Sequence, residues 1–348
     1  MPAEIAVSVI VPVFNGADTL DRCLAALAAQ HRRDFELIVV DNGSSDGSAV
    51  MAERWRQRMS VPLHVLHEAK AGAGAARNHG ARRAGGRFLA FTDADCEPDA
   101  DWLDIGLAML AESERDVCAL AGPAWGTLEG DVAARLLGLT SLSVGLTENI
   151  YRDAGDTGTQ GFAAANLWMT REMFLDLQGF DESLAHTGED MDLCARFYRA
   201  GGRLRYSPAL RVRHIHPSGM ANIWRKQVQY GRAHARLLGR YGESGIHLDL
   251  PWLGHLRIPC RCFIWCNLAS AEKKVLLLLL LSCWLPWLLL LVPVYAYWTG
   301  RHLCQRAGAL GVRCGVLEPL ALGGLLVMKS AAMTWGRLRG SCRGVVTC

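Results

Sequence analysis

The strongest chemical signal in the sequence is a pair of carboxylates, Asp93 and Asp95, that directly follows the apolar run 88–91. In an extended segment, a spacing of two residues places both side chains on the same face. Paired carboxylates suit a hard divalent cation, and such a cation can neutralise a departing phosphate group. The pair therefore predicts a site for Mg²⁺ or Mn²⁺, although two aspartates at this spacing are also common in loops.

A second acidic cluster lies downstream, where Glu189, Asp190 and Asp192 precede an apolar, helix-like stretch. Neighbouring carboxylates resist joint ionisation, so one of them can have a pKa raised toward neutrality and serve as a general base. The alternative is that these side chains only complement the positive end of a helix dipole. Both interpretations place the cluster at the start of a helix.

The elements that must position these residues follow a β-α-β rhythm. Short, β-rich apolar runs occur at 7–13, 35–40, 63–66 and 88–91. Between the first two runs, an apolar stripe predicts a helix that covers the sheet; it comprises Leu20, Cys23, Leu24 and Leu27. The pattern predicts an α/β fold with a mostly parallel sheet, whose ligands collect beyond the carboxyl ends of the strands.

Three further motifs precede the carboxylate pair in order. They are Val-Ile-Val-Pro-Val-Phe-Asn at 9–15, Asp-Asn-Gly-Ser-Ser-Asp at 41–46 and Gly-Ala-Ala-Arg-Asn at 74–78. With Asp93 and Asp95, this set resembles family 2 glycosyltransferases of the GT-A fold, over about residues 7 to 235. The resemblance implies a nucleotide-sugar donor, for which we favour a UDP-sugar, and a divalent cation as cofactor.

The resemblance also implies roles for individual residues in donor binding. An arginine fork suits phosphate oxygens, and a carboxylate suits the imide N–H of a base. The implied nucleotide-binding residues are Pro12, Phe14, Asn15, Asp41, Ser44, Arg77 and Asp93. Among them, Arg77 would face the diphosphate and Asp41 the base. For Pro12 and Phe14 the alternative is simple packing at a strand end.

On the acceptor side, the resemblance makes Asp190 the general base, and Glu189 and Asn166 would bind the acceptor. If Asp190 deprotonates a hydroxyl opposite the leaving diphosphate, displacement occurs in one step and the anomeric configuration inverts. For Asn166 the alternative is an ordinary turn residue.

The resemblance further implies a late histidine that completes the metal site. Asp95, aided by Asp93, would hold the cation together with His214, and His216 is the alternative histidine. A histidine at the end of a strand can also be purely structural.

Two features narrow the reaction class. Processive polysaccharide synthases that resemble this domain carry Gln-x-x-Arg-Trp, whereas here Gln229 and Arg232 are followed by Ala233. Transfer of a single sugar is therefore the better interpretation. The run 72–77 is similar to a dinucleotide-binding fingerprint, but Arg77 replaces its last small residue and the run follows the third strand. A dehydrogenase is disfavoured, and the remaining alternative is a non-catalytic, nucleotide-sugar-binding membrane scaffold.

Composition limits the partners. The net charge is only +3, with 37 basic against 34 acidic residues and no basic block, which argues against nucleic acid as a partner. The twelve cysteines include no C-x-x-C pair and most of them lie from Cys260 onward, so we expect reduced thiols and no disulfide framework.

The C-terminal part of the chain is the most apolar. Residues 275–298 carry no charge and are numerous enough to cross a hydrocarbon core, and 314–333 is a candidate second span. The N-terminus lacks a signal-peptide pattern. We therefore expect the cell inner membrane, a cytoplasmic catalytic domain and a lipid-linked or membrane-proximal glycan acceptor. The predicted organisation is a catalytic domain over 1–245, a linker over 246–274, a membrane region over 275–335 and a basic tail over 336–348.

Overall fold

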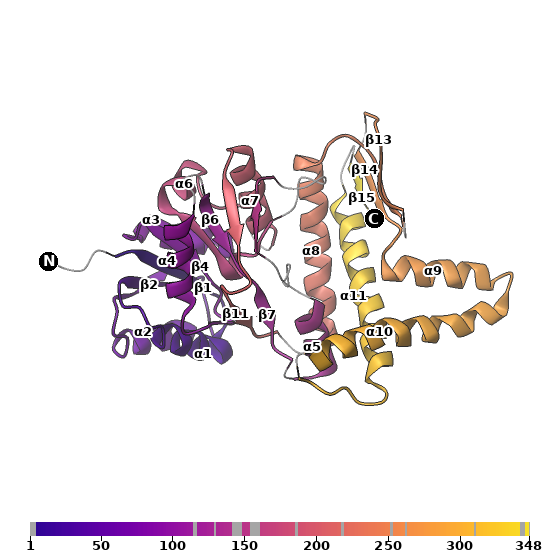
Figure 1. The fold of residues 1–348 in the computed structure, drawn as a ribbon, viewed down its shortest axis with the longest axis horizontal. Helices are drawn as coiled ribbons and strands as arrows, with labels where there is room; N and C mark the ends of the chain where they lie inside the picture. Colours follow the sequence, from indigo (N-terminus) through magenta and orange to yellow (C-terminus); the bar gives the residue numbers. More distant parts are fainter. Residues whose placement is uncertain are drawn as a thin grey trace. The chain divides into compact units, whose positions relative to one another are not determined.

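The chain forms two compact units in the computed structural model (Figure 1). The structure describes residues 5–113, 117–128, 130–140, 148–153, 161–184, 187–216, 219–250, 253–261, 263–309, 311–341 and 345–347. Unit 1 holds residues 1–125 and 142–215, and unit 2 holds 126–141 and 216–348. The sequence placed the first boundary at 245 instead, because the residues around 220–241 read as a continuation of the catalytic domain.

Unit 1 is built on one large sheet. Within its described residues, the strand order is β3-β2-β1-β4-β9-β6-β10-β8, in which β1 pairs in parallel with both β2 and β4, while β9 is antiparallel to β4 and β6. The strands are β1 (Val7–Val13), β2 (Phe35–Asp41), β3 (Leu63–His67), β4 (Phe88–Phe91), β6 (Val117–Ala121), β8 (Asn149–Tyr151), β9 (Leu167–Thr170) and β10 (Arg203–Tyr206). The predicted α/β fold with a mostly parallel sheet is confirmed.

Helices cover both faces of this sheet. Val9 and Leu37 point into one core together with the stripe of α1, whereas their chain neighbours Ile10 and Ile38 point into a second core on the other face. This is the alternation expected of a strand buried on both sides. The helices of unit 1 are α1 (Ala17–Ala28), α2 (Ser48–Arg56), α3 (Ala73–Arg83), α4 (Trp102–Glu112), α6 (Arg171–Asp176) and α7 (Glu189–Arg199), with a short η1 (Ala164–Asn166). All four residues of the predicted α1 stripe are buried.

A small second sheet in unit 1 carries the residues that follow β4. It consists of β5 (Cys96–Pro98), β11 (Val212–His214) and β7 (Ala124–Gly126), in the order β5-β11-β7. β5 and β11 are antiparallel, and their register sets His214 opposite Cys96. Two segments far apart in the sequence are thereby brought together.

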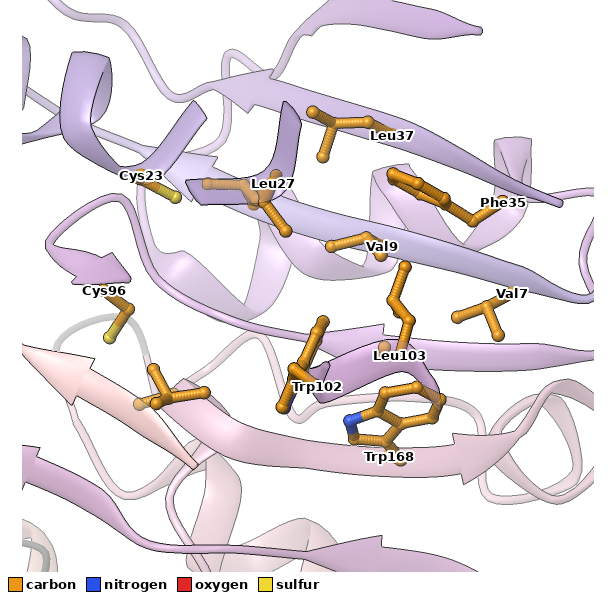
Figure 2. Close-up of a cluster of buried hydrophobic side chains, with 14 of the residues drawn as sticks. Val7, Val9, Cys23, Leu27, Phe35, Leu37, Cys96, Trp102, Leu103 and Trp168 are labelled. Carbon is orange, nitrogen blue, oxygen red and sulfur yellow. The ribbon is translucent and has the colours of Figure 1, made fainter. Parts of the chain in front are cut away.

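Two tryptophans fill the core between α4 and the sheet (Figure 2). The rings of Trp102 and Trp168 meet edge to face with centroids 4.9 Å apart. Gly106 of α4 lies against the second ring, where an added Cβ would be 2.5 Å from the Trp168 Cη2 atom. Only a glycine allows this close approach.

We expect Gly106→Ala to lower the free energy of unfolding by about 1–3 kcal/mol, because the new methyl group overpacks the Trp168 contact. Helix propensity alone would act in the opposite direction, by about 1 kcal/mol. Gly324 is a matched control, since it is also helical and has no atom within 4 Å of an added Cβ. Urea denaturation of both variants gives the answer, and a stabilised Gly106→Ala would contradict the packing argument.

Unit 2 is a helical assembly with its own small sheet. Figure 1 shows α8 (Met220–Tyr241) and α11 (Glu318–Gly340) running side by side. Their crossing is close, because an added Cβ on Gly231 would lie 2.2 Å from the Met333 carbonyl oxygen. The remaining elements are α5 (Val132–Thr140), α9 (Ala271–Ser282), η2 (Pro286–Leu290), α10 (Leu291–Ala309) and the sheet of β12 (Gly245–Leu250), β13 (Gly254–Ile258), β14 (Phe263–Asn267) and β15 (Val345–Thr347).

Three features of unit 2 differ from the prediction. The linker predicted over 246–274 contains β12, β13 and β14. The uncharged stretch 275–298 is split into α9, η2 and α10, and Pro286, which cannot continue an α-helix hydrogen-bond ladder, begins η2. Within the described ranges, no helix is both long enough and apolar enough to cross a membrane. The predicted spans over 275–298 and 314–333 are therefore not supported by this structure. Of the predicted basic tail, 342–344 and 348 lie outside the described residues.

Candidate active site

The polar residues predicted at the strand ends gather at one edge of the main sheet. β1, β2 and β4 run in parallel, with Val13 opposite Asp41 and Ile10 opposite Phe91. Because the carboxyl ends of parallel neighbours lie together, the segments that follow these strands meet. This edge is the candidate active site.

Two loops at this edge are tied together by hydrogen bonds. The backbone N–H of Asn15 donates to Ser44 Oγ at 2.9 Å, and the N–H of Ser45 donates to Asn15 Oδ1 at 2.8 Å. Asn15 has a positive φ of 48°, which asparagine tolerates better than most residues. Asp41 is buried and accepts from the N–H of Ser44 at 3.3 Å. These three predicted nucleotide-binding residues thus form one constellation.

Phe14 and Pro12 behave differently from each other. The Phe14 ring is 64% exposed, so it remains available to pack against a flat ligand. Pro12 is buried inside β1, where it pairs with Val40. Its side chain packs within the strand, which agrees with the structural alternative given for Pro12.

The Arg77 side chain is buried, whereas a residue that contacts a bound diphosphate is expected to face the open site. Its guanidinium is buried and donates to Glu189 Oε1 at 2.8 Å and to Asp93 Oδ1 at 2.5 Å. Burial alone would lower the pKa of Arg77, but the carboxylates of Asp93 and Glu189 outweigh it and raise that pKa. In this structure Arg77 fixes two acidic side chains that come from different parts of the chain, and its role in binding phosphate stays a prediction. The sequence contains no sign of this pairing.

A further contact holds the loop between α6 and α7 against α3. Asn78 Nδ2 donates to the Phe180 carbonyl at 2.9 Å and to Glu182 Oε1 at 2.9 Å. Gly179, at φ 68°, leaves room for this, since an added Cβ would lie 2.4 Å from Asn78 Oδ1. The sequence analysis assigned no role to Asn78, although this residue ends the Gly-Ala-Ala-Arg-Asn motif, and none to Glu182.

Asp95 lies beside His214. Asp95 Oδ1 is 3.5 Å from His214 Nε2, and together with the Cys96 thiol their candidate ligand atoms lie within 4.8 Å of one another. The β5–β11 register produces this meeting. Burial, together with the nearby carboxylates of Asp95 and Asp93, raises the pKa of Cys96. A carboxylate oxygen and an imidazole nitrogen are the better donors, and they fit Mn²⁺ or Mg²⁺.

Asp93 and His216 take other positions. The Asp93 carboxylate is paired with Arg77, and it does not belong to the three-residue group found among the described residues. His216 belongs to unit 2, where an added Cβ on Gly126 would lie 2.6 Å from its Nε2 atom. Of the two histidines, His214 is the one that lies next to Asp95.

Asp190 sits in the first turn of α7 and is partly buried. Burial and the neighbouring charge of Glu189 raise the pKa of Asp190 to about 7, against the opposing effect of Arg77. Asp192 is fully buried and pairs with Arg196 at 2.8 Å. The predicted crowding is therefore real for Asp190 and Glu189, but burial has the larger effect.

Asn166 is committed to the fold. Its amide nitrogen donates to the carbonyls of Pro123 and Leu210 at 3.1 and 2.6 Å, and its oxygen accepts from Trp102 Nε1 at 2.9 Å. The side chain is buried, and both of its polar atoms are used in these bonds. These bonds stabilise the second sheet and the tryptophan core, which favours the structural alternative for Asn166, and acceptor binding by this residue stays a prediction.

Comparison with known families agrees with this geometry. The family described as Glycosyl transferase family 2 matches residues 8–173, and Glycosyl transferase family group 2 matches residues 117–310, more than half of the chain. The chain belongs to glycosyl transferase family group 2. The predicted enzyme class, a glycosyltransferase, is thereby confirmed.

Curated relatives of this glycosyltransferase match it over only part of their length. It is 32% identical over 248 residues to the pre-mycofactocin glycosyltransferase of Mycobacterium tuberculosis, a match that covers 70% of this chain and 50% of that protein. It is 35% identical over 113 residues to glycosyltransferase AglE of Haloferax volcanii, covering 32% and 37% respectively. The chain thus spans about half, or less, of the length of these relatives.

Solved structures support the same fold. The mannosyltransferase PcManGT from Pyrobaculum calidifontis, in complex with GDP-Man and Mn²⁺, superposes with a TM-score of 0.57 at 20% identity, covering 96% of this chain and 86% of that one. S. aureus TarS in complex with UDP-GlcNAc gives a TM-score of 0.51 at 19% identity, covering 68% and 72%. At this identity the likeness concerns the GT-A fold alone.

Proposed function

We propose that this glycosyltransferase transfers one sugar from a UDP-sugar to an acceptor hydroxyl, with a divalent cation and with inversion of the anomeric configuration. The observation that carries the proposal is the meeting of the Asp95 carboxylate and the His214 imidazole, 3.5 Å apart. Oxygen and nitrogen donors that converge at the carboxyl ends of the strands suit a cation beside a diphosphate.

The proposed mechanism assigns each part of the site one task. When bound, a divalent cation supplies charge neutralisation for the leaving diphosphate. Asp95 and His214 would hold this cation. Arg77 keeps Asp93 and Glu189 in place, and Asp190 accepts the proton of the acceptor hydroxyl. No covalent intermediate is needed, and a single displacement inverts the configuration.

The donor and acceptor are proposed on more general grounds. Solved neighbours with UDP-GlcNAc or GDP-Man support a nucleotide-sugar donor. The constellation of Asn15, Asp41 and Ser44 offers polar groups for the nucleotide, and the exposed Phe14 ring offers a stacking surface. Ala233 in place of the tryptophan of processive synthases supports a single transfer. We propose a lipid-linked or membrane-proximal glycan as acceptor, at the cell inner membrane with the catalytic domain in the cytoplasm.

Thermal stabilisation by a panel of nucleotide sugars, with and without Mn²⁺, tests the donor and the cation together. A donor at about 100 times its Kd should stabilise the fold by about 2.7 kcal/mol, and only in the presence of the cation. Release of free UDP on adding an acceptor then separates an enzyme from a binding scaffold. Equal stabilisation with and without Mn²⁺ would contradict the metal site.

We expect kcat/KM to rise with pH through about 7 and to level off above it. The raised pKa of Asp190 means that its base form is lost below about pH 7, so the rate falls about tenfold for each further pH unit. A pH–rate profile at subsaturating acceptor measures this. Donor affinity over the same pH range is the control, since it should change much less than the rate.

A further inference from the structure

The segment 275–300, called the apolar hairpin below, exposes large apolar side chains along its length. It comprises the apolar part of α9, the turn with η2 and the first half of α10, and Figure 1 shows both helices extending away from α11 within unit 2. α9 contains no buried residue. Exposed fractions reach 59% at Leu280, 86% at Trp284 and 70% at Leu290. A continuous apolar surface of this kind marks an interaction site.

At the tip of the apolar hairpin, backbone N–H groups are bonded to carbonyls of the same segment. The N–H groups of residues 283–285 each donate to a carbonyl one turn earlier at 3.0 to 3.3 Å, and Pro286, which follows, has no N–H. The hydroxyls of Ser282 and Thr299 donate to backbone carbonyls of their own helices at 2.6 and 3.0 Å. Such bonds also close helix ends in water, but in hydrocarbon they are required, so the tip of the hairpin is compatible with insertion.

Basic residues flank the apolar hairpin on both sides. Lys274 precedes it, and the exposed Arg301 and Arg306 follow it, while no charged residue occurs from 275 to 300. Positive charge next to an apolar, inserted segment matches an anionic lipid surface. A second copy of the chain would instead bring like charges together, so lipid is the better occupant.

The base of the apolar hairpin is fixed to the rest of unit 2. Glu272, just before the hairpin, accepts hydrogen bonds from Ser330 and Thr334 of α11, the latter at 2.6 Å. At the other end α10 touches α11, since an added Cβ on Gly300 would lie 1.7 Å from the Pro319 carbonyl oxygen. A hairpin with a fixed base and an uncovered apolar tip can hold unit 2 at a defined height above a surface.

Length decides how deep such a hairpin reaches. At about 1.5 Å per residue, the apolar part of α9, 275–282, is roughly 12 Å long, and that of α10, 291–300, is roughly 15 Å long. A hydrocarbon core is about 30 Å thick, so one leaflet is about 15 Å. We propose that the apolar hairpin inserts into one leaflet of an anionic bilayer and leaves on the side from which it entered. The inference rests on the proposed function only for its link to a membrane-proximal acceptor.

Flotation of the full chain with lipid vesicles tests the insertion. The protein should bind vesicles of phosphatidylcholine and phosphatidylglycerol, and bind pure phosphatidylcholine more weakly. Leu280→Glu should reduce the partition coefficient at least about tenfold, because a carboxylate would enter hydrocarbon. Leu256→Glu on β13 is the matched control, since Leu256 is also exposed, at 45%, and should change partitioning less than about twofold. The fluorescence of Trp284 is the difference in emission between the wild type and Trp284→Phe. Bromine atoms on the lipid acyl chains should quench this difference.

Three results would overturn the inference. One is a wild-type protein that does not float with either vesicle, and another is equal loss of binding in the two glutamate variants. The third is an oligomer without lipid that Leu280→Glu dissociates, which would make a second copy the occupant. Thermal melts confirm that both variants are folded. Calorimetry with UDP and Mn²⁺ is run in parallel. Loss of donor binding would contradict the proposed function, whereas loss of vesicle binding would contradict the membrane inference.

Discussion

Asp190→Asn is expected to reduce kcat by roughly 10² to 10⁴, with donor affinity changing by less than about tenfold. An amide has nearly the shape of the carboxylate but cannot accept the proton of the acceptor hydroxyl. Its oxygen can still accept from the Met191 N–H, which Asp190 does at 2.8 Å, so the start of α7 should keep its structure. Initial rates together with calorimetric titration of UDP measure the two effects separately.

The assignment of Asp190 as the base also predicts the stereochemistry of the product. If Asp190 is the base of a single displacement, an α-linked donor gives a β-linked product, which NMR of the product reads directly. Glu172→Gln is the matched control, because Glu172 is also a first-turn helix carboxylate and has no predicted part in the reaction. Retained configuration, or an Asp190→Asn enzyme that transfers at the parent rate, would reduce Asp190 to a carboxylate that stabilises a helix start.

Asp95→Ala is expected to abolish most of the effect of Mn²⁺ on UDP affinity, lowering affinity in the presence of the cation by at least about 10- to 100-fold. Loss of an outer-shell partner already costs that much, and Asp95 is proposed as a direct ligand. His214 alone would then hold the cation, because Asp93 is engaged with Arg77. Calorimetry with UDP, with and without Mn²⁺, gives the difference.

Glu97→Ala supplies the control for Asp95→Ala. Glu97 lies two residues further along β5, and its carboxylate pairs with Arg22 and Arg213. Removing it changes the local charge by the same amount without touching the pair of Asp95 and His214. If Glu97→Ala weakens Mn²⁺-dependent binding as strongly as Asp95→Ala, the effect is general electrostatics and Asp95 is not a ligand.

The resemblance of the motifs to a known family was sufficient to indicate the enzyme class, but it did not reveal the contacts of individual side chains. Asn166 and Arg77 are both polar residues within recognisable motifs, and both were expected to contact substrate. Their actual partners lie far along the chain: Arg77 binds Glu189, and Asn166 binds the carbonyls of Pro123 and Leu210. A motif indicates that a residue has a role. Only the contacts of that residue show whether it can bind a ligand directly or instead positions other residues that bind the ligand.

Local patterns determined the parts of the fold that depend on local physics. The fully buried strands β1 and β2 follow from continuous apolar runs, and the apolar stripe of α1 follows from helix periodicity, so both could be read directly. The pair of Asp93 and Asp95 could be placed at a strand end for the same reason. The stretch 275–298 shows the limit of this reasoning. Absence of charge indicates an apolar surrounding, but Pro286 and the turn before it divide the segment into pieces too short to span a bilayer.

The sequence by itself determined the β-α-β order, the edge of the sheet where the ligand site lies and the types of residue that carry the chemistry. Each of these depends on contacts within a few residues or on the common direction of parallel strands. Only the tertiary structure decided that His214 meets Asp95, through the register of β5 and β11, and that α8 pairs with α11 in unit 2. Those contacts join residues separated by about a hundred positions, and they depend on the packing of elements whose individual sequences do not encode their partners.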